Sequence, residues 1–220
     1  MYIPKYYSVT DVAEITRFVE SIRLGTLVTY GEDGFFGTNL PWLLNGDLQT
    51  GATLTGHVAR ANPHWQKIAG AADALVIFSG PDAYVSPNWY PSKTEHGRVV
   101  PTWAYQAVHV EGQVQVFEDL PSLEAVVRTL SSVMEHNQPQ PWTLEAAPRD
   151  YIDRMLGAIV GVRLAVTKVE AKYKLGQKMA PQDAAGAASG LAREGTASAQ
   201  AVADAIHKDS AHNDAMRKQR

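Results

Sequence analysis

The chain has 220 residues, of which 45% are hydrophobic and 20% are charged, so neither a disordered polyelectrolyte nor a membrane protein matches this balance. Twenty Lys and Arg residues against 23 Asp and Glu residues give a formal net charge of −3, which removes a globally basic surface as an argument for nucleic-acid binding and leaves only a local basic patch open. The absence of cysteine excludes disulfides, cysteine-ligated zinc, iron–sulfur clusters and thiol catalysis.

The N-terminal half of the chain is predicted to begin with a helix and to continue as a meander of strands. Ser8 and Asp11 have the form of a capping box, and apolar residues then recur at helical spacing, which predicts a helix over 9–22. Asn62-Pro63 opens a short helix that we expect to end near Gly70. Short apolar runs separated by turn signals predict strands over 24–30, 35–44, 52–58, 74–79 and 84–90.

The segment 91–98 has turn composition and mixed charge, so we expect an exposed loop there. Valines alternate with polar residues over 108–116, which is typical of a half-buried strand. Helices are predicted over 120–134 and 144–156, and a closing strand over 159–173. Because the strands do not alternate regularly with helices, the pattern favours an α+β protein built on an antiparallel barrel.

Alanine accounts for ten of the residues 181–206, with Gly186, Gly190 and Gly195 interspersed. This composition predicts a helical extension, broken at the glycines, and the last fourteen residues are expected to fray. We therefore predict a barrel domain over 1–180 and a C-terminal helical extension with a flexible tail over 181–220.

The segment 56–65 combines Arg60, His57, His64, Asn62 and Trp65 at a junction between a strand and a helix. The N–H groups at a helix start favour an anion, and Arg60 could add a forked charged contact, so one interpretation is phosphate binding. The alternative is structural: Asn62 caps the helix, Trp65 belongs to the core and Arg60 pairs with a surface carboxylate.

Two further segments, 79–90 and 100–105, are rich in aromatic residues and prolines within the β region. Tyr and Trp side chains there could sandwich a flat aromatic ligand, or they could seal the end of a barrel, and the sequence favours neither alternative. The seven histidines lack tight ligand spacing, so we expect no metal site. Nucleophile-elbow, Walker A and Gly-x-Gly-x-x-Gly motifs are also missing from the sequence.

Several of these segments together resemble the PaiB-like family of FMN-binding negative transcriptional regulators. The resemblance rests on 1–7, 56–65, 84–90, 100–103 and the element that begins at Lys174. It implies an antiparallel FMN-binding split β-barrel, usually a homodimer, with FMN as cofactor. Asn39, Ala104, Gly176 and Lys178 depart from the residues that are usual in the family.

The resemblance also implies a set of cofactor-binding residues. The strand backbone at Asn39, Leu40 and Pro41 would pass along the isoalloxazine ring, and Arg60 would meet the phosphate. Lys174 and Gln177 would reach the site from the C-terminal element. The implied set is Asn39, Leu40, Pro41, His57, Val58, Arg60, Asn62, Trp65, Lys174 and Gln177.

Three functions follow as hypotheses. The first, favoured by the resemblance, is a flavin-binding repressor of transcription, although neither the net charge nor an evident helix-turn-helix supports direct DNA contact. The second is an oxidoreductase in which FMN accepts a hydride from a reduced nicotinamide or a small substrate. The third is a barrel without cofactor that acts as a dimeric binding module.

The N-terminus lacks the apolar core of a secretory signal, and the most apolar stretch, 155–166, is shorter than the ~20 residues that cross a bilayer. We therefore expect a cytoplasmic protein without a membrane partner.

Overall fold

A computed structural model describes residues 1–68 and 72–218, with side chains described up to 209 except at 72. The contacts between residues divide the chain into two compact units. Unit 1 comprises 1–10, 79–107 and 170–220, and unit 2 comprises 11–78 and 108–169. The predicted boundary at residue 181 stays a prediction, and residues 181–220 belong to unit 1 together with two earlier segments.

The strands form one sheet, and the long ones contribute residues to both units. In chain order the strands are β1 (Ser8–Val9), β2 (Leu24–Gly31), β3 (Gly34–Pro41), β4 (Leu43–Asn45), β5 (Thr53–Ala59), β6 (Ala72–Val85), β7 (Thr102–Phe117) and β8 (Ile159–Lys174). They are hydrogen-bonded in the order β3-β2-β6-β7-β8-β5-β4, and β1 pairs with β8. The pairs β1–β8, β2–β3, β2–β6, β4–β5 and β5–β8 are antiparallel. The expected antiparallel α+β architecture is confirmed.

Within unit 2 the sheet curls until β3, at one end of the strand order, lies against β5, near the other end. The two strands approach so closely that a Cβ atom at Gly56 would lie 2.7 Å from the Pro41 carbonyl oxygen. Because side chains do not fit into so small a gap, glycine is required on β5 at this point. β3 and β5 are not neighbours in the hydrogen-bonded order, so the barrel closes here by packing.

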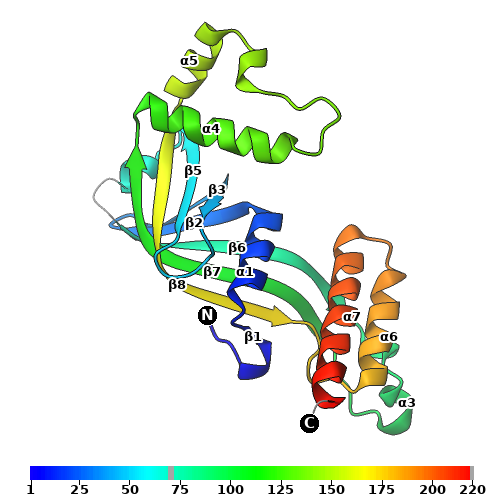
Figure 1. Cartoon of the computed structure of the whole chain (residues 1–220). Coiled ribbons are helices and arrows are strands. Elements are labelled where there is room, and N and C mark those ends of the chain that lie inside the picture. The colour runs from blue at the N-terminus through cyan, green and yellow to red at the C-terminus, as the bar shows by residue number, and fades with distance from the viewer. Residues whose placement is uncertain (69–71, 219–220) are drawn as a thin grey trace. The chain divides into compact units, whose positions relative to one another are not determined.

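Unit 2 also holds the helices α1 (Val12–Ile22), α2 (His64–Ile68), α4 (Leu120–Glu135) and α5 (Arg149–Gly157), and the 3-10 turn η3 (Leu144–Ala146). Figure 1 shows α4 and α5 together beyond the ends of β7 and β8. They pack through a buried cluster formed by Leu123, Leu144, Ile152 and Leu156. The helix predicted over 144–156 is therefore two elements, a 3-10 turn followed by α5.

α1 begins later than the capping pattern predicts. Asp11 is its N-cap, and the carboxylate accepts a hydrogen bond of 2.9 Å from the Glu14 backbone N–H. Ser8 and Val9 instead form β1 and pair with Lys172 and Ala171 of β8. The capping box of Ser8 was therefore the wrong interpretation, because ladder hydrogen bonds hold that residue in an extended conformation.

Unit 1 holds η1 (Lys5–Tyr7), η2 (Pro87–Trp89), α3 (Ser92–His96), α6 (Pro181–Ala192) and α7 (Ala197–Lys218). β6 is one long strand that covers the predicted strand 74–79 and ends at Val85, so only the first two residues of the strand predicted over 84–90 are extended in the sheet. η2 follows, with the Ser86 hydroxyl accepting from the Asn88 backbone N–H. The segment 91–98, expected to be a loop, contains α3, and Ser92 is buried.

Figure 1 shows α6 and α7 side by side in unit 1. α6 runs unbroken through Gly186 and Gly190, contrary to the prediction of breaks at both residues. Gly195 does separate the helices, and its φ of 72° lies in the left-handed region that favours glycine. α7 remains helical to Lys218, through most of the stretch where we expected fraying.

The short helix expected to reach Gly70 is observed as α2 up to Ile68, and its predicted end lies outside the described residues. Residues 219 and 220 of the predicted tail lie outside them as well. In the described part of the chain, every helix is too short or too polar to span a membrane.

Candidate functional site

The predicted site residues fall into two groups. Those from Asn39 to Trp65 all lie in unit 2, whereas Lys174 and Gln177 lie in unit 1. The first group comes from the end of β3, the end of β5, the turn after β5 and α2. The close approach of β3 and β5 brings these segments together.

The turn between β5 and α2 is tied to β3 by Asn62. Its amide nitrogen donates to Thr38 Oγ1 at 3.2 Å, and its amide oxygen accepts from the His64 backbone N–H at 2.9 Å. Asn62 therefore performs the capping role that the structural alternative predicts, and it also contacts β3. This contact places the turn beside the strand that carries Asn39 and Leu40.

His64 is the most deeply buried polar residue of this region, with 0% of its surface exposed. Its Nδ1 lies 2.8 Å from Thr38 Oγ1 and its Nε2 lies 2.9 Å from Thr29 Oγ1. We assign the Thr38 hydroxyl, which accepts from Asn62, as the donor to Nδ1, and with this tautomer Nε2–H donates to Thr29. Burial, and secondarily the charge of Lys67, lowers the pKa of His64 below its ordinary value, which favours this neutral ring.

His64 was absent from the predicted set, and its role is to join α2 to β2 and β3. A histidine next to a helix start gave no signal of this role, because Thr29 and Thr38 lie far away in the sequence.

The end of β3 offers backbone rather than side-chain chemistry. Asn39 is exposed, and its amide oxygen accepts a hydrogen bond of 2.6 Å from Thr26 Oγ1 of β2. Leu40 points the other way and is buried in the barrel. In the described sheet β3 is the last strand of the order, so one edge of its backbone has no ladder partner. Such an edge can bind the polar rim of a flat ligand.

Arg60 is engaged by groups of its own unit. The guanidinium forms an ion pair with Glu118 and donates to the carbonyl oxygens of Gly157 at 2.8 Å and Ile159 at 3.1 Å. Its Cζ atom also lies 5.9 Å from the centre of the Trp65 ring, and Trp65 Nε1 donates to the Arg60 carbonyl oxygen at 2.8 Å. The arginine thus joins the turn after β5 to the junction of α5 and β8.

His57 and Val58 lie side by side in β5 and point to opposite faces of the strand. Val58 is buried in the barrel. The Nδ1 atom of His57 is buried and has no hydrogen-bond partner among the described residues. Burial lowers the pKa of His57, so the ring is neutral at neutral pH. An unpartnered ring nitrogen is a feature that a bound ligand could satisfy.

In unit 1, Lys174 and Gln177 flank a tight turn. Lys174 Nζ donates to Thr102 Oγ1 at 2.7 Å. The Gln177 side chain accepts from the Leu175 backbone N–H at 2.9 Å and donates to the Tyr173 carbonyl oxygen at the same distance. Gly176 has a φ of 87°, a conformation that side chains disfavour. Gln177 therefore holds the turn, whereas Lys174 directs an ammonium toward a cavity.

Comparison with known proteins identifies the fold and the family. Residues 1–168 match a family described as "Putative FMN-binding domain". The chain belongs to this FMN-binding family. The resemblance drawn from the sequence is thereby confirmed, and FMN is the cofactor of the family.

Among relatives, the chain is 36% identical over 178 residues to "Protease synthase and sporulation protein PAI 2" of Bacillus subtilis, covering 80% of this chain and 82% of that protein. An FAD and heme binding protein from Mycobacterium smegmatis has a similar structure, with a TM-score of 0.57, 16% identity, and coverage of 76% of this chain and 73% of the other. A conserved hypothetical protein from Mycobacterium tuberculosis gives a TM-score of 0.55 at 20% identity, over 79% and 91% of the two chains. These two similarities show the split-barrel fold.

The residues of this chain fit FMN in two respects. The unpartnered Nδ1 of His57 offers a hydrogen-bonding group, and the free backbone edge of β3 suits the polar rim of an isoalloxazine. At Arg60 the fit is conditional, because the carboxylate of Glu118 already holds the guanidinium. An incoming phosphate would therefore have to replace that carboxylate, a competition between two anions for one cation.

Proposed function

We propose that this protein is an FMN-binding regulator that represses transcription as a homodimer, with the flavin held by unit 2. The observation that carries the proposal is the family match over 1–168, joined to the 36% identity with PAI 2. The name of that relative connects it with protease synthesis and sporulation, which supports a regulatory role over a metabolic one.

In this proposal each residue of unit 2 has a distinct task. The backbone of Asn39, Leu40 and Pro41 binds the isoalloxazine edge, and His57 adds a neutral ring nitrogen. Val58 keeps β5 in the barrel, while Asn62 and Trp65 hold the turn that presents Arg60. Arg60 binds the phosphate once the phosphate has replaced the Glu118 carboxylate. When bound, FMN supplies a ring that can be oxidised or reduced, and the residues named here bind and orient it. Lys174 and Gln177 stay candidates that belong to unit 1.

Dimerisation is proposed from the barrel itself. β3 and β4 are the terminal strands of the described order, and exposed strand edges are usually covered in soluble proteins. Light scattering after size-exclusion chromatography measures this directly, and a mass near twice that of the chain is expected. A monomer at micromolar concentration would contradict the dimer.

The first experiment is a titration of the cofactor-stripped protein with FMN, followed by flavin fluorescence, with riboflavin as the control that lacks the phosphate. We expect saturable binding of FMN and weaker binding of riboflavin. Equal binding of both would contradict a phosphate site, and no binding at high micromolar FMN would remove flavin from the function.

The regulatory step needs a separate measurement because the formal charge of −3 gives no general attraction to DNA. Binding to genomic DNA fragments is measured over a range of salt concentrations, with and without FMN. A salt-dependent affinity above that of an acidic control protein supports repression by direct contact. Binding equal to that control leaves an FMN-binding protein that does not act on DNA.

A further inference from the structure

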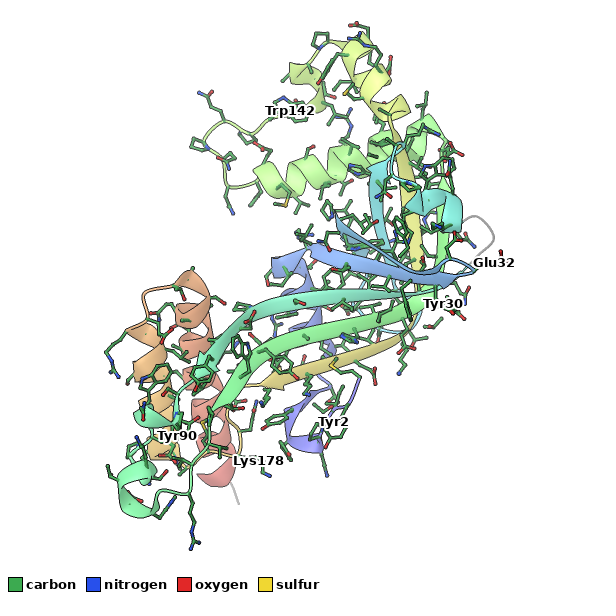
Figure 2. The ribbon with its side chains drawn as sticks, turned by 180° about the vertical axis from the view of Figure 1, so that it is seen from behind. Tyr2, Tyr30, Glu32, Tyr90, Trp142 and Lys178 are labelled. Atoms are coloured by element: carbon green, nitrogen blue, oxygen red, sulfur yellow. The ribbon has the colours of Figure 1, made fainter. Side chains whose placement is uncertain are left out.

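Unit 1 contains a cavity of about 430 Å³ that lies entirely among its own residues. Its walls come from η1, the end of β6, α3, the start of β7, the end of β8 with the turn after it, α6 and α7. The volume is in the range of sites that enclose small organic molecules. Figure 2 labels Tyr90 and Lys178, two of the side chains that line it.

Tyr90 is the unusual member of this wall. Only 7% of the residue is exposed, and the hydroxyl has no hydrogen-bond partner among the described residues. Burial, followed by the charge of Asp183 and the neighbouring Tyr84, raises the pKa of Tyr90 to about 12, so the hydroxyl keeps its proton at neutral pH. A buried donor without an acceptor is costly to leave unpaired. Because Tyr90 lines the cavity, its unpaired hydroxyl is a group that an acceptor on a bound ligand could satisfy.

The charged residues around the cavity also favour an anionic ligand. Three cations, Arg98, Lys174 and Lys178, line it against two carboxylates, Glu95 and Asp183. The carboxylate of Asp183 is already committed, since its oxygens accept from the Ser92 backbone N–H at 3.1 Å and from the Ser92 hydroxyl at 2.7 Å. Lys174 donates one hydrogen bond to Thr102, and an ammonium has three donors, so it can also bind an anion.

The rest of the wall is apolar and aromatic. Trp103 lines the cavity, and its indole is held in place because Nε1 donates to Asp82 at 2.9 Å. Val85, Val100, Leu175, Met179 and Ile206 complete the apolar surface. Val85, Val100 and Trp103 come from the two aromatic segments, 79–90 and 100–105, for which the sequence left a flat ligand and a barrel seal as equal alternatives.

We propose that the unit 1 cavity is a binding site for a small aromatic carboxylate, separate from the flavin site. The ring packs against Trp103 and the aliphatic side chains, and the acid group accepts a hydrogen bond from the Tyr90 hydroxyl. Lys174 and Lys178, which line the same cavity, supply the balancing positive charge. The site needs no residue of unit 2, and Lys174 is the one flavin candidate that also lines it.

The test uses isothermal titration of the full chain with naphthalene-2-carboxylate, and with 2-naphthylmethanol as the uncharged probe of similar shape. We expect the acid to bind about 10-fold more tightly than the alcohol. Tyr90→Phe should weaken the acid by about 10-fold and the alcohol much less, since a carboxylate accepts a stronger hydrogen bond than a neutral hydroxyl oxygen. Lys174→Met should have the same selective effect. The matched control is Tyr84→Phe, because Tyr84 is 47% exposed and outside the cavity wall.

A second titration is made with the protein saturated in FMN. Unchanged binding of the acid supports a separate site, and binding of the acid by a preparation that fails to bind FMN supports it equally. Displacement of the acid by FMN would overturn the proposal and assign the cavity to the flavin. Equal affinity for the two probes, no binding of either at millimolar concentration, or a Tyr90→Phe variant that binds the acid normally would overturn it as well.

Discussion

His64 in unit 2 and Tyr90 in unit 1 are both buried side chains with polar atoms, and they differ in what those atoms contact. Both ring nitrogens of His64 have hydroxyl partners within 3 Å, whereas the Tyr90 hydroxyl has none among the described residues. His64 lies between elements that pack against each other, while Tyr90 lines a cavity.

The difference teaches how to separate structural polar groups from binding ones. A buried group whose hydrogen bonds are all made stabilises the fold, and its loss leaves its partners unpaired. A buried group with an unused donor beside empty space costs stability in the free protein, and that cost is recovered only when a ligand supplies the acceptor. In unit 2, His57 Nδ1 is likewise buried without a partner among the described residues, which is why His57 remains a flavin candidate.

The largest effect is expected for His64→Ala. The substitution leaves a cavity in the core and removes the partners of Thr29 and Thr38, so the free energy of unfolding should fall by about 3–4 kcal/mol. Urea denaturation followed by circular dichroism measures the change, and His136→Ala, at an exposed position after α4, is the control. A loss below about 1 kcal/mol would mean that the network does not hold α2 to the sheet.

The same distinction between a structural group and a binding group can be tested on the charged side chain of Arg60. Arg60→Ala should weaken FMN by about 1.5–3 kcal/mol, roughly 10- to 100-fold, and leave riboflavin unchanged, because riboflavin lacks the phosphate that Arg60 would bind. Flavin fluorescence titration gives both affinities. Glu118→Gln should tighten FMN, since it removes the competing carboxylate. If neither variant changes the ratio of FMN to riboflavin affinity, Arg60 is purely a structural residue.

Tyr90→Phe is expected to have a smaller effect of the opposite sign on stability. Removing a hydroxyl that has no partner should raise the free energy of unfolding by about 1 kcal/mol in the ligand-free protein. Thermal unfolding measures it, with Tyr84→Phe as the comparison. A destabilised Tyr90→Phe protein would show that the hydroxyl has an acceptor in solution, and the contrast with His64 would then disappear.

The smallest effect on stability is expected from protonation of His57 and His64. The folded chain holds the pKa of His57 and of His64 below the value of about 6.5 that an unfolded chain has, so the unfolded state binds protons more readily. Their contribution to stability is therefore complete above about pH 6.5 and declines as the pH falls below it. Urea midpoints between pH 8 and pH 5 test this, and a midpoint that rises on acidification would contradict it.

Much of the fold is readable from local patterns. The alternation of valines over 108–116 predicts the inner part of β7, and the apolar spacing over 120–134 predicts α4 almost to its ends. These elements depend on which face of a strand or helix is buried, and that information lies in neighbouring residues.

The site is less readable because its contacts join distant segments. Arg60 meets Glu118, which lies 58 residues away, and His64 meets Thr29, 35 residues away. The composition of 91–98 is typical of a loop, yet the Asp183 carboxylate, 91 residues from Ser92, binds the first turn of α3. No local pattern contains these partners, so they could not be predicted from spacing.

Gly186 and Gly190, inside α6, limit which amino-acid substitutions the protein tolerates. A Cβ atom at Gly186 would lie 2.1 Å from the Trp89 carbonyl oxygen, and one at Gly190 would lie 2.1 Å from the Trp89 indole. Alanine at either position would favour a helix in isolation, yet here it would displace the residue that precedes Tyr90. Random mutagenesis should therefore accept many residues at the exposed Ser189 and only glycine at its neighbour Gly190. The fit of α6 against Trp89 is therefore visible in the sequence as a position that only glycine can occupy.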